Sequence, residues 1–554
     1  MTPPYTDEKN VLILISLLKA HGITQVVASP GSANSSLVVS LQNDVNFTLY
    51  SAVDERSAAY MACGIAEESN RPVVITCTGA TASRNYLPAI TEAFYRKLPI
   101  LAITATLDVA KVGHHVAQVI DRSHMPVDTY KLSLNLPIIK DDDDVWDCEI
   151  KVNKAILELG RHGGGPVHLN MPTIMGKFNV VEKLPDVRVI RRVSVHDTYP
   201  PIPDADIGVF IGAHAKFDEK LTAMIGKFCK KTGATVFCDH TSNYKGPNRL
   251  LTSLLASQVN EPKDAYRPGI LIHIGEVTGD YSIFKIHAKE VWRVSEDGEI
   301  RDTFRRLSNV FEMREIDFFS HYAQQNLSPR PYYENLIAKT AKLREQIPDL
   351  PLSNLWLASK LAHRIPEGST IHFAILNSLR SWNFFEMPAS VTSASNVGGF
   401  GIDGNLSTLI GASLTCPERL FYCVIGDLAF FYDMNALGNR HVGNNLRILL
   451  INNGKGAEFV TYRHRNATLG KDVDKYVAAG GHYGKQSDSL VRHYAEALGF
   501  EYFVVHMKEE FGAIHEAFLS PEKIERPILL EVFTNSDDEH EAQARICNII
   551  KYVE

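Results

Sequence analysis

Residues 421–459 read FYCVIGDLAFFYDMNALGNRHVGNNLRILLINNGKGAEF. The stretch alternates apolar runs and polar turns around one helical segment, in the order Phe421–Ile425, Gly426-Asp427, Ala429–Arg440, Arg447–Ile451 and Asn452-Asn453-Gly454. This pattern predicts a strand, a turn, a helix, a second strand and a second turn. In a parallel sheet both turns lie at the carboxyl ends of the strands, where such sheets bind ligands.

The two turns carry side chains with oxygen atoms. The first turn offers the carboxylate of Asp427, and the second offers the amide oxygen of Asn453, 26 positions later. Two or three such ligands, together with phosphate oxygens and water, suit Mg²⁺. Gly-Asp and Asn-Asn pairs are common in turns, so the informative feature is their spacing within the strand and turn pattern.

Length and composition describe an ordinary protein of several α/β domains. A chain of 554 residues is too long for a single core, and about three domains are expected. The apolar content of 45% and the charged content of 22% are typical of globular proteins. A formal net charge of −7 argues against nucleic acid as the main partner.

The N-terminal sequence and the cysteines favour a cytoplasmic protein that does not bind a membrane. The apolar run Val11–Leu18 is too short to span a bilayer, and it lacks a basic flank and a small-residue cleavage site. The eight cysteines are scattered and form no C-x-x-C pair. This distribution predicts buried free thiols in a reducing compartment.

Residues 1–185 alternate strands and helices, which predicts a first domain with a doubly wound parallel sheet. The expected strands are Gln25–Ala28, Phe47–Val53, Val73–Cys77 and Ile100–Thr104, with the run Gly165–Pro172 closing the domain. The expected helices are Lys9–His21, Ser35–Gln42, Ser57–Glu68, Asn85–Arg96 and Ile150–Arg161. Residues 105–140 look irregular, and Asp141–Asp144 is interpreted as a solvated turn rather than a metal site.

Two further α/β domains are expected, so the fold class is α/β with three doubly wound parallel-sheet domains. Residues 173–203 contain several prolines and suit a linker. A middle domain, 186–345, has predicted strands at 207–211, 235–238 and 270–274, but no complete G-x-G-x-x-G motif. We therefore predict no dinucleotide there. The third domain, 346–554, holds the opening stretch.

This plan resembles the thiamine diphosphate (ThDP)-dependent decarboxylase superfamily, with its pyrimidine-binding, central and diphosphate-binding domains. Within the superfamily, the sequence is most similar to the 2-succinyl-5-enolpyruvyl-6-hydroxy-3-cyclohexene-1-carboxylate synthase (MenD) family. The resemblance covers nearly the full length and is most specific in the run GIDGNLST at 401–408. Other segments that carry it are Pro30-Gly31-Ser32, Val53-Asp54-Glu55-Arg56, Arg71-Pro72-Val73, Thr78-Gly79, Gly165–Asn170, Asn377-Ser378, Ser395-Asn396, Gly426-Asp427-Leu428 and Asp433-Met434-Asn435.

The resemblance implies roles for residues around the reactive end of the cofactor. Glu55 matches the family glutamate that shares a proton with the pyrimidine ring, although it also suits a surface glutamate paired with Arg56. Gln118 matches a glutamine near the reactive C2 atom. Ile402 matches the apolar wedge that bends the cofactor, unless it is ordinary core, and the Phe400 carbonyl would accept from the pyrimidine amino group. Further implied cofactor contacts are Ser32, Thr78 and Gly79.

The resemblance also implies a Mg²⁺ ion that anchors the diphosphate. Its ligands would be the side chains of Asp427 and Asn453 and the backbone carbonyl of Lys455. The family more often has glycine at the third position, but only the carbonyl is needed there. Further contacts to the diphosphate or the substrate are implied for Asn377, Ser378, Gly426, Leu428 and Ala457.

The residues at the expected substrate-binding positions depart from the MenD pattern. That family binds multiply anionic substrates, for which arginines make bidentate carboxylate contacts. At the four matching positions this chain has Ala33, Leu107, Trp382 and Val397. One hydrogen bond to a charged group contributes about 1.5–3 kcal/mol, so losing four lowers the affinity for that substrate pair by several orders of magnitude. We therefore expect a MenD-like enzyme with another substrate.

Other residues are candidates for replacing these contacts. His114 and His115 lie where pyruvate-decarboxylase-like members carry a histidine pair that moves protons, although two solvent-facing loop histidines remain the alternative. Arg84 and Arg380 are candidate carboxylate anchors. Candidates for the pocket entrance are Lys455, Glu458 and Arg463.

The leading hypothesis is a ThDP- and Mg²⁺-dependent lyase or carboligase. A 2-oxo acid would lose CO₂, and the product would be protonated or joined to an acceptor. The alternatives are authentic MenD synthase activity and a non-catalytic binding subunit with a ThDP fold. Because the family builds each site between two subunits, a homodimer or homotetramer is expected. The sequence names neither the donor acid nor the acceptor.

Overall fold

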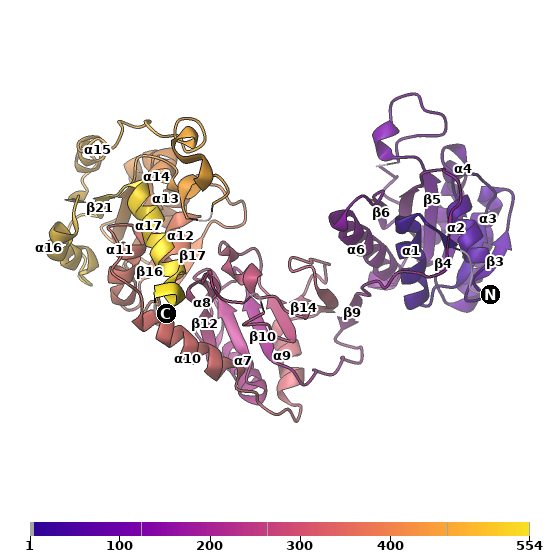
Figure 1. The fold of residues 1–554 in the computed structure, drawn as a ribbon, viewed down its shortest axis with the longest axis horizontal. Coiled ribbons are helices and arrows are strands. Elements are labelled where there is room, and N and C mark those ends of the chain that lie inside the picture. The colour runs from indigo at the N-terminus through magenta and orange to yellow at the C-terminus, as the bar shows by residue number, and fades with distance from the viewer. Residues whose placement is uncertain (1–4, 123, 263, 463, 553–554) are drawn as a thin grey trace. The chain divides into compact units, whose positions relative to one another are not determined.

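The computed structural model describes residues 5–122, 124–262, 264–462 and 464–552 (Figure 1). It divides into two compact units. Unit 1 comprises Met1–Ser194 and Gly298–Val310, and unit 2 comprises Val195–Asp297 and Phe311–Glu554. Within the described residues, no helix combines the length and the apolar character needed to cross a membrane. The three domain boundaries stay a prediction.

Unit 1 contains a parallel sheet in the order β3-β2-β4-β5-β7-β6. Its strands are β2 (Gln25–Ala28), β3 (Thr48–Ser51), β4 (Val73–Cys77), β5 (Ile100–Thr106), β6 (Leu132–Asn135) and β7 (Val167–Pro172). A short antiparallel pair joins β1 (Tyr5–Thr6) to β8 (Val180–Val181). The helices are α1 (Lys9–Ala20), α2 (Ser35–Gln42), α3 (Glu55–Ser69), α4 (Thr81–Asn85), α5 (Leu87–Tyr95) and α6 (Asp142–Glu158).

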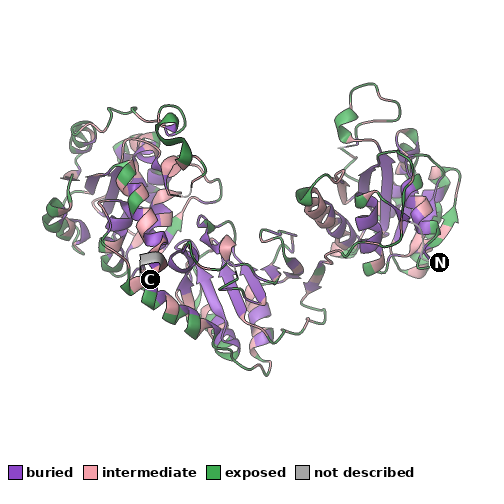
Figure 2. Ribbon diagram, viewed as in Figure 1, coloured by how far each residue is buried: buried purple, intermediate pink, exposed green. Residues whose placement is uncertain are grey.

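The strands of this sheet are largely buried (Figure 2), and alternating side chains contribute to two hydrophobic clusters. Val26 and Val74 belong to one cluster, together with residues of α1 and α6. Their neighbours Val27 and Val73 belong to the other, together with alanines of α3 and α5. Both faces are therefore covered, which explains why the strands are continuous apolar runs.

The C-terminal part of unit 2 contains a parallel sheet in the order β17-β16-β18-β19-β21-β20. Its strands are β16 (Thr370–Phe373), β17 (Thr392–Ser395), β18 (Phe421–Gly426), β19 (Leu446–Asn452), β20 (Glu501–Val505) and β21 (Ile528–Phe533). The helices that follow in this part are α11 (Asn354–Leu361), α12 (Asn377–Trp382), α13 (Asn405–Ser413), α14 (Asp427–Asp433), α15 (Leu490–Ala497), α16 (Lys508–Leu519) and α17 (Ser536–Cys547). Numbered along the chain, both sheets follow the order 2-1-3-4-6-5.

The first part of unit 2 has a further parallel arrangement, in which β12, β11, β10, β13 and β14 are neighbours in that order. These strands are β10 (Ile207–Ile211), β11 (Thr235–Cys238), β12 (Arg249–Leu251), β13 (Ile270–Ile274) and β14 (Glu290–Ser295). Helices here are α7 (Glu219–Thr232), α8 (Thr252–Ala256), α9 (Glu315–Ala323) and α10 (Tyr332–Glu345). The remaining strands are β9 (Arg191–Ser194) and β15 (Leu307–Glu312).

The α/β fold with several doubly wound parallel sheets is confirmed, and the differences from the sequence are local. Residues 105–140 were expected to be irregular, yet they contain the edge strand β6. The expected turn Asp141–Asp144 instead starts α6, because the Asp141 side chain accepts a hydrogen bond from the Asp144 N–H at 3.0 Å. Acidic residues at a helix N-terminus also stabilise it through the helix dipole.

Candidate functional site

Three loops meet at the carboxyl ends of β2, β4 and β5 in unit 1. A Cβ on Gly31, after β2, would lie 2.8 Å from the Thr78 Cβ. A Cβ on Gly79, after β4, would lie 2.8 Å from the backbone oxygen of Gln118 and 3.2 Å from that of Ala105. These close approaches require glycine and bring Thr78, Gly79 and Gln118 together at the edge where parallel sheets bind ligands.

The loop after β2 presents one of two adjacent residues to solvent. Ser32 is exposed, and its backbone carbonyl accepts a hydrogen bond from Ser35 Oγ at 2.8 Å, at the start of α2. Ala33 is 6% exposed, and its carbonyl accepts from Thr173 Oγ1 at 3.0 Å. Ser32 is therefore open to a ligand, whereas Ala33 is packed into the unit.

Glu55 is the first residue of α3. The helix starts here because the Asp54 side chain accepts hydrogen bonds from the N–H groups of Arg56 and Ser57, at 2.8 and 3.1 Å. Glu55 is half-buried, and its Oε2 accepts from Asn85 Nδ2 at 3.1 Å. The preceding strand β3 is an edge strand with mostly exposed side chains.

The predicted catalytic residues of the following loop lie at the surface of unit 1. His114, His115 and Gln118 are all exposed. His115 and Gln118 have φ angles of 54° and 63°, a conformation that non-glycine residues seldom adopt. The backbone oxygen of Gln118 lies against Gly79, in the turn after β4. The structure therefore places the backbone of Gln118 beside the predicted cofactor residue Gly79.

The sequence reasoning missed Arg122, which lies in the same segment. It is 2% exposed, and its Nη1 atom would lie 3.7 Å from a Cβ on Gly79. Its Nη2 atom donates a long hydrogen bond of 3.5 Å to the Ala105 carbonyl. No local motif marks this arginine, because its burial depends on packing against distant strands.

In unit 2, the register of β18 and β19 brings the two turns of the opening stretch together. Gly426 pairs with Ile451, so Asp427 lies beside the second turn. The Asp427 carboxylate accepts hydrogen bonds from the N–H groups of Leu428, at 2.7 Å, and of Gly454, at 2.6 Å. The carboxyl group is 4% exposed, and burial raises its pKa to about 6.

The remaining predicted metal ligands follow β19. Asn453 is half-buried, and its side-chain oxygen accepts a hydrogen bond of 3.4 Å from the Lys455 N–H. The Lys455 side chain is engaged elsewhere, because its Nζ donates to Asp474 at 2.6 Å. A small cavity of about 10 Å³ borders Asp427 and Gly454, and this is the volume of a single water molecule or ion.

The GIDG segment presents a half-buried apolar side chain. Ile402 packs against the hydrophobic core of α13, β18 and β19, yet it remains partly exposed. Phe400 has a φ of 57°, and its ring stacks on Tyr281 with ring centroids 6.0 Å apart. The partial exposure of Ile402 leaves its predicted role sterically open, while the role of the Phe400 carbonyl stays a prediction.

The other predicted cofactor residues of unit 2 lie at strand ends and helix starts. Asn377 and Ser378 begin α12 directly after Leu376, which has a φ of 63°. Ser378 is 3% exposed and Ala457 is 4% exposed, whereas Gly426 and Leu428 are half-buried. The structure thus gathers this set along the carboxyl edge of the second sheet.

One candidate anchor is already engaged within unit 2. Arg380 forms an ion pair with Glu458, donates to the Gly279 carbonyl at 3.2 Å, and lies 4.6 Å from the centre of the Tyr281 ring. Burial raises the pKa of Glu458, and the arginine opposes that rise. Arg380 is therefore neutralised by its own chain. Arg463, the third candidate for the pocket entrance, lies outside the described residues.

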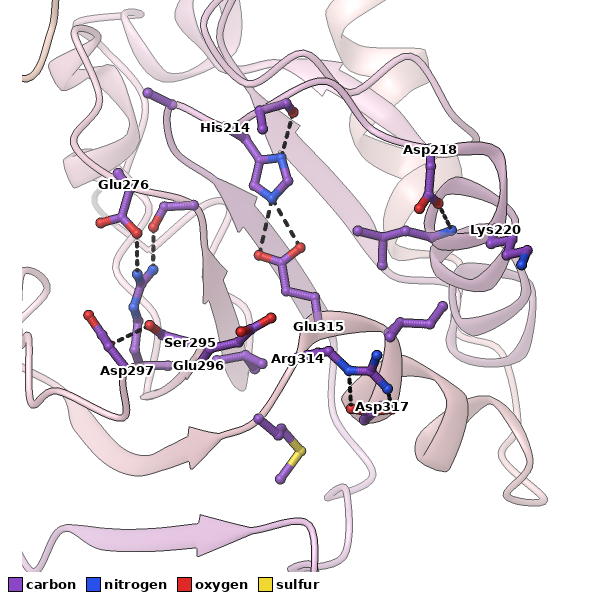
Figure 3. A pocket seen from close by; sticks show the side chains of 18 residues that line it. His214, Asp218, Lys220, Glu276, Ser295, Glu296, Asp297, Arg314, Glu315 and Asp317 are labelled. Carbon is purple, nitrogen blue, oxygen red and sulfur yellow. Dashed lines mark hydrogen bonds and ion pairs between the residues drawn. The ribbon is translucent and has the colours of Figure 1, made fainter. Parts of the chain in front are cut away.

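A separate pocket of about 850 Å³ opens at the carboxyl ends of β10, β13 and β14 (Figure 3). The His214 ring stands above Glu315, whose two oxygens lie 3.2 and 3.1 Å from His214 Nε2. Asp218 caps α7 by accepting from the Leu221 N–H at 2.7 Å. A carboxylate therefore occupies the helix terminus where a dinucleotide phosphate would bind, which makes this pocket unfavourable for such a cofactor.

The oxygen atoms at the carboxyl edge of the second sheet, in unit 2, suit a hard metal ion that is also bound to phosphate. Among the described residues, no three His, Cys, Asp or Glu side chains form a metal cluster. A site made by Asp427 would therefore need amide and carbonyl oxygens, and Asn453 and Lys455 supply these from the adjacent turn. Such an oxygen set, completed by diphosphate and water, is typical of Mg²⁺.

Comparison with known proteins agrees with this geometry. Residues 11–125 match the family described as thiamine pyrophosphate enzyme, N-terminal TPP binding domain, and residues 378–532 match its C-terminal TPP binding domain. The 2-succinyl-5-enolpyruvyl-6-hydroxy-3-cyclohexene-1-carboxylate synthase of Phocaeicola vulgatus is 33% identical over 552 residues, which cover 96% of this chain and 97% of the relative. This chain belongs to the thiamine pyrophosphate enzymes. Synthases of the same name from Bacteroides thetaiotaomicron and Flavobacterium johnsoniae are 33% and 28% identical, over 96% and 80% of this chain and 97% and 83% of the relatives.

This thiamine pyrophosphate enzyme has MenD-like relatives. Its two segments that match the TPP binding domains lie on the two sheets that share the same strand order. The first match contains Glu55 and the turn Thr78-Gly79. The second contains Asp427 and Asn453. The cofactor is thus thiamine diphosphate, whereas the role of each residue stays a prediction.

Proposed function

We propose that this chain is a ThDP- and Mg²⁺-dependent enzyme that removes CO₂ from a 2-oxo acid. The product is then protonated or joined to an acceptor. We propose further that the substrate differs from that of the MenD synthases. Support comes from the cofactor residues, which follow the family pattern, and from the substrate positions, which do not.

The observation that carries this proposal is the environment of the four replaced arginine positions. Trp382 is completely buried, Val397 is 4% exposed and Ala33 is 6% exposed. Leu107 is half-buried at the end of β5. None of these side chains can donate to a carboxylate, apart from the indole N–H of Trp382, which is enclosed. A substrate with several carboxylates would therefore lose charged partners at these positions.

The proposed roles follow from the positions of the residues. Bound ThDP supplies a nucleophilic carbon and an electron sink for decarboxylation. Glu55 would share a proton with the pyrimidine ring, and Ile402 would hold the cofactor bent. Asp427 and Asn453, with the Lys455 carbonyl, would hold Mg²⁺ against the diphosphate.

A screen of 2-oxo acids tests the proposal. Purified protein with ThDP and Mg²⁺ is supplied with single 2-oxo acids, and CO₂ release is followed. We expect turnover of at least one acid that depends on both ThDP and Mg²⁺, with Asp427→Asn as the inactive control. Absence of turnover across the screen, with the cofactor shown to be bound, would argue against the proposal.

A second candidate function is the synthase activity of the relatives, which the 33% identity across nearly the whole chain favours. Assay with 2-oxoglutarate and isochorismate decides between the two: robust turnover of that pair would overturn the proposal of a different substrate. A third candidate, a non-catalytic binding subunit, is tested by calorimetry. Failure to bind ThDP in the presence of Mg²⁺ would exclude both enzyme functions.

We also propose self-association as a homodimer or a tetramer of two dimers, in the cytoplasm. The outer face of α3 supports this proposal. Its residues Tyr60 and Met61 are 48% and 41% exposed, and Val53 just before the helix is 80% exposed. Exposed apolar residues beside Glu55 suit a contact with a second copy of the chain.

A further inference from the structure

Arg122 is a buried arginine whose hydrogen bonds are incomplete. The residue is 2% exposed, and its Nε and Nη1 atoms have no hydrogen-bond partner within the described residues. Its Nη2 atom makes a single contact at 3.5 Å, to the carbonyl of Ala105. Buried polar groups almost always have partners, so these unused donors need an explanation.

Among the described residues, no counter-charge is found around Arg122 either. The side chains whose charges act on it most strongly are Cys77, Arg84 and Tyr130, and none of them is a carboxylate. Burial lowers the pKa of Arg122 to about 10 and raises that of Cys77 to about 12, so the thiol is neutral beside a charged guanidinium. A buried cation without a partner is strongly destabilising, which indicates that an anion from outside the unit completes the site.

The position of Arg122 indicates what this anion is. Its Nη1 atom would lie 3.7 Å from a Cβ on Gly79, which follows β4, and its Nη2 atom donates to the carbonyl of Ala105, in β5. Ligands bind at the carboxyl edge of parallel sheets, and a guanidinium is the protein group best matched to a carboxylate.

We propose that Arg122 anchors the carboxylate of the 2-oxo acid substrate. This inference rests on the proposed function and identifies the residue that takes over from the four missing arginines. The two anchors suggested by the sequence are less suitable, because Arg380 is paired with Glu458 and Arg84 is exposed and donates to the Asp121 carbonyl.

The replacement Arg122→Met tests this assignment. If Arg122 binds the substrate carboxylate, its removal should raise the thermal stability of the protein but weaken its function. Methionine has a similar length and no charge. Without substrate, the variant should melt at a higher temperature than the wild type, since an unpaired buried charge is removed. Its KM for the 2-oxo acid found in the screen should rise at least tenfold, the loss expected for one charge-assisted hydrogen bond. A structural arginine would instead give a lower melting temperature on replacement.

Arg71→Met is the matched control, because Arg71 is exposed and precedes β4 at the opposite edge of the sheet. It should change neither KM nor the melting temperature. The variant Arg122→Lys keeps the charge but not the planar guanidinium, and it should recover only part of the affinity. An Arg122→Met variant that melts below the wild type, or that has an unchanged KM, overturns the inference.

A binding measurement separates this inference from the proposed function. Pyruvate, 2-oxobutyrate and 2-oxoglutarate are added to wild type and to Arg122→Met, and the melting temperature is followed. At least one acid should stabilise the wild type and not the variant. If this holds but no acid is decarboxylated, the proposed function fails while the anchor stands. If acids are decarboxylated but stabilise both proteins equally, the anchor fails and the function stands.

Discussion

Glu55 occupies the first position of α3, half-buried and hydrogen-bonded to Asn85. The replacement Glu55→Gln keeps the shape of the side chain but removes the proton-sharing carboxyl group. We expect ThDP to bind with unchanged affinity, while exchange of its C2 proton slows by about 10²- to 10⁴-fold. Calorimetry measures the first quantity, and NMR of hydrogen–deuterium exchange measures the second. The control Glu68→Gln, on the same helix, should alter neither; unchanged exchange in Glu55→Gln would remove this residue from the mechanism.

Gly79 shows how closely the loops of unit 1 pack. The replacement Gly79→Ala places a methyl group 2.8 Å from the Gln118 carbonyl oxygen, so backbone must move. We expect a loss of about 1–3 kcal/mol in unfolding free energy, measured by urea denaturation, together with loss of activity. Gly512→Ala is the control, because its Cβ meets no atom within 4 Å in the helix α16. That variant should gain about 0.5–1 kcal/mol. Equal effects of the two replacements would contradict the close packing around Gly79.

At the residue scale, the sequence predicted what depends on local pattern and missed what depends on packing. Asp427 and Asn453 were placed together because each follows a strand of one parallel pair. The pairing of Arg380 with Glu458, 78 positions apart, has no local signal. The burial of Arg122 has none either, because Arg122 lies in an irregular loop whose path depends on contacts with β4 and β5.

Elements were predictable where burial imposes a strong pattern. The strands Gln25–Ala28, Val73–Cys77, Ile207–Ile211 and Ile270–Ile274 have the expected bounds, because strands covered on both faces are continuous apolar runs. The edge strand β6 was missed, because its residues LSLN are only half-buried and carry no such run. The start of α6 was misplaced, because four aspartates were assigned to solvent and not to a helix cap.

The N-terminal part of α17 provides a test of pH dependence. Glu539 is 3% exposed, and its Oε1 atom accepts from the Asn354 N–H at 3.0 Å and from Thr534 Oγ1 at 3.1 Å. Burial raises its pKa to about 7, above the unperturbed value of 4.5. The neutral carboxyl is the stable form in the fold, so its contribution is complete below pH 4.5 and is lost as the pH rises through about 7.

Glu539→Gln should therefore have little effect on unfolding free energy near pH 5 and should stabilise the protein near pH 8, by up to roughly 3 kcal/mol. Glutamine keeps a carbonyl oxygen for both hydrogen bonds and stays neutral at every pH. Denaturation curves at the two pH values measure the difference. The control Glu541→Gln changes an exposed residue of the same helix and should show no such trend. A stabilisation that does not grow with pH would show that Glu539 is not held neutral.

At the scale of the whole molecule, the most informative feature is the repeated strand order of two sheets. Glu55 and the turn Thr78-Gly79 lie at the carboxyl edge of the first sheet, and Asp427 and Asn453 lie at the carboxyl edge of the second. The alternation of strands and helices predicted both sheets. Whether the two edges form one active site stays a prediction, since this depends on assembly and not on local sequence.

Subunit complementation tests the proposal that each active site combines the Glu55 edge of one chain with the Asp427 edge of another. Glu55→Gln and Asp427→Asn should each be inactive alone. In a mixed dimer, one site would then hold both replacements and the other would hold neither. If the subunits exchange freely, half of the dimers are mixed, so an equal mixture should regain about a quarter of the wild-type activity.

Dilution of the wild type until the dimer dissociates should abolish activity. Replacement of the exposed Met61 by a charged residue should abolish activity already at higher protein concentrations, at which the wild type is still active. An inactive mixture of demonstrably exchanged subunits, or a fully active monomer, would place both edges of the site within one chain.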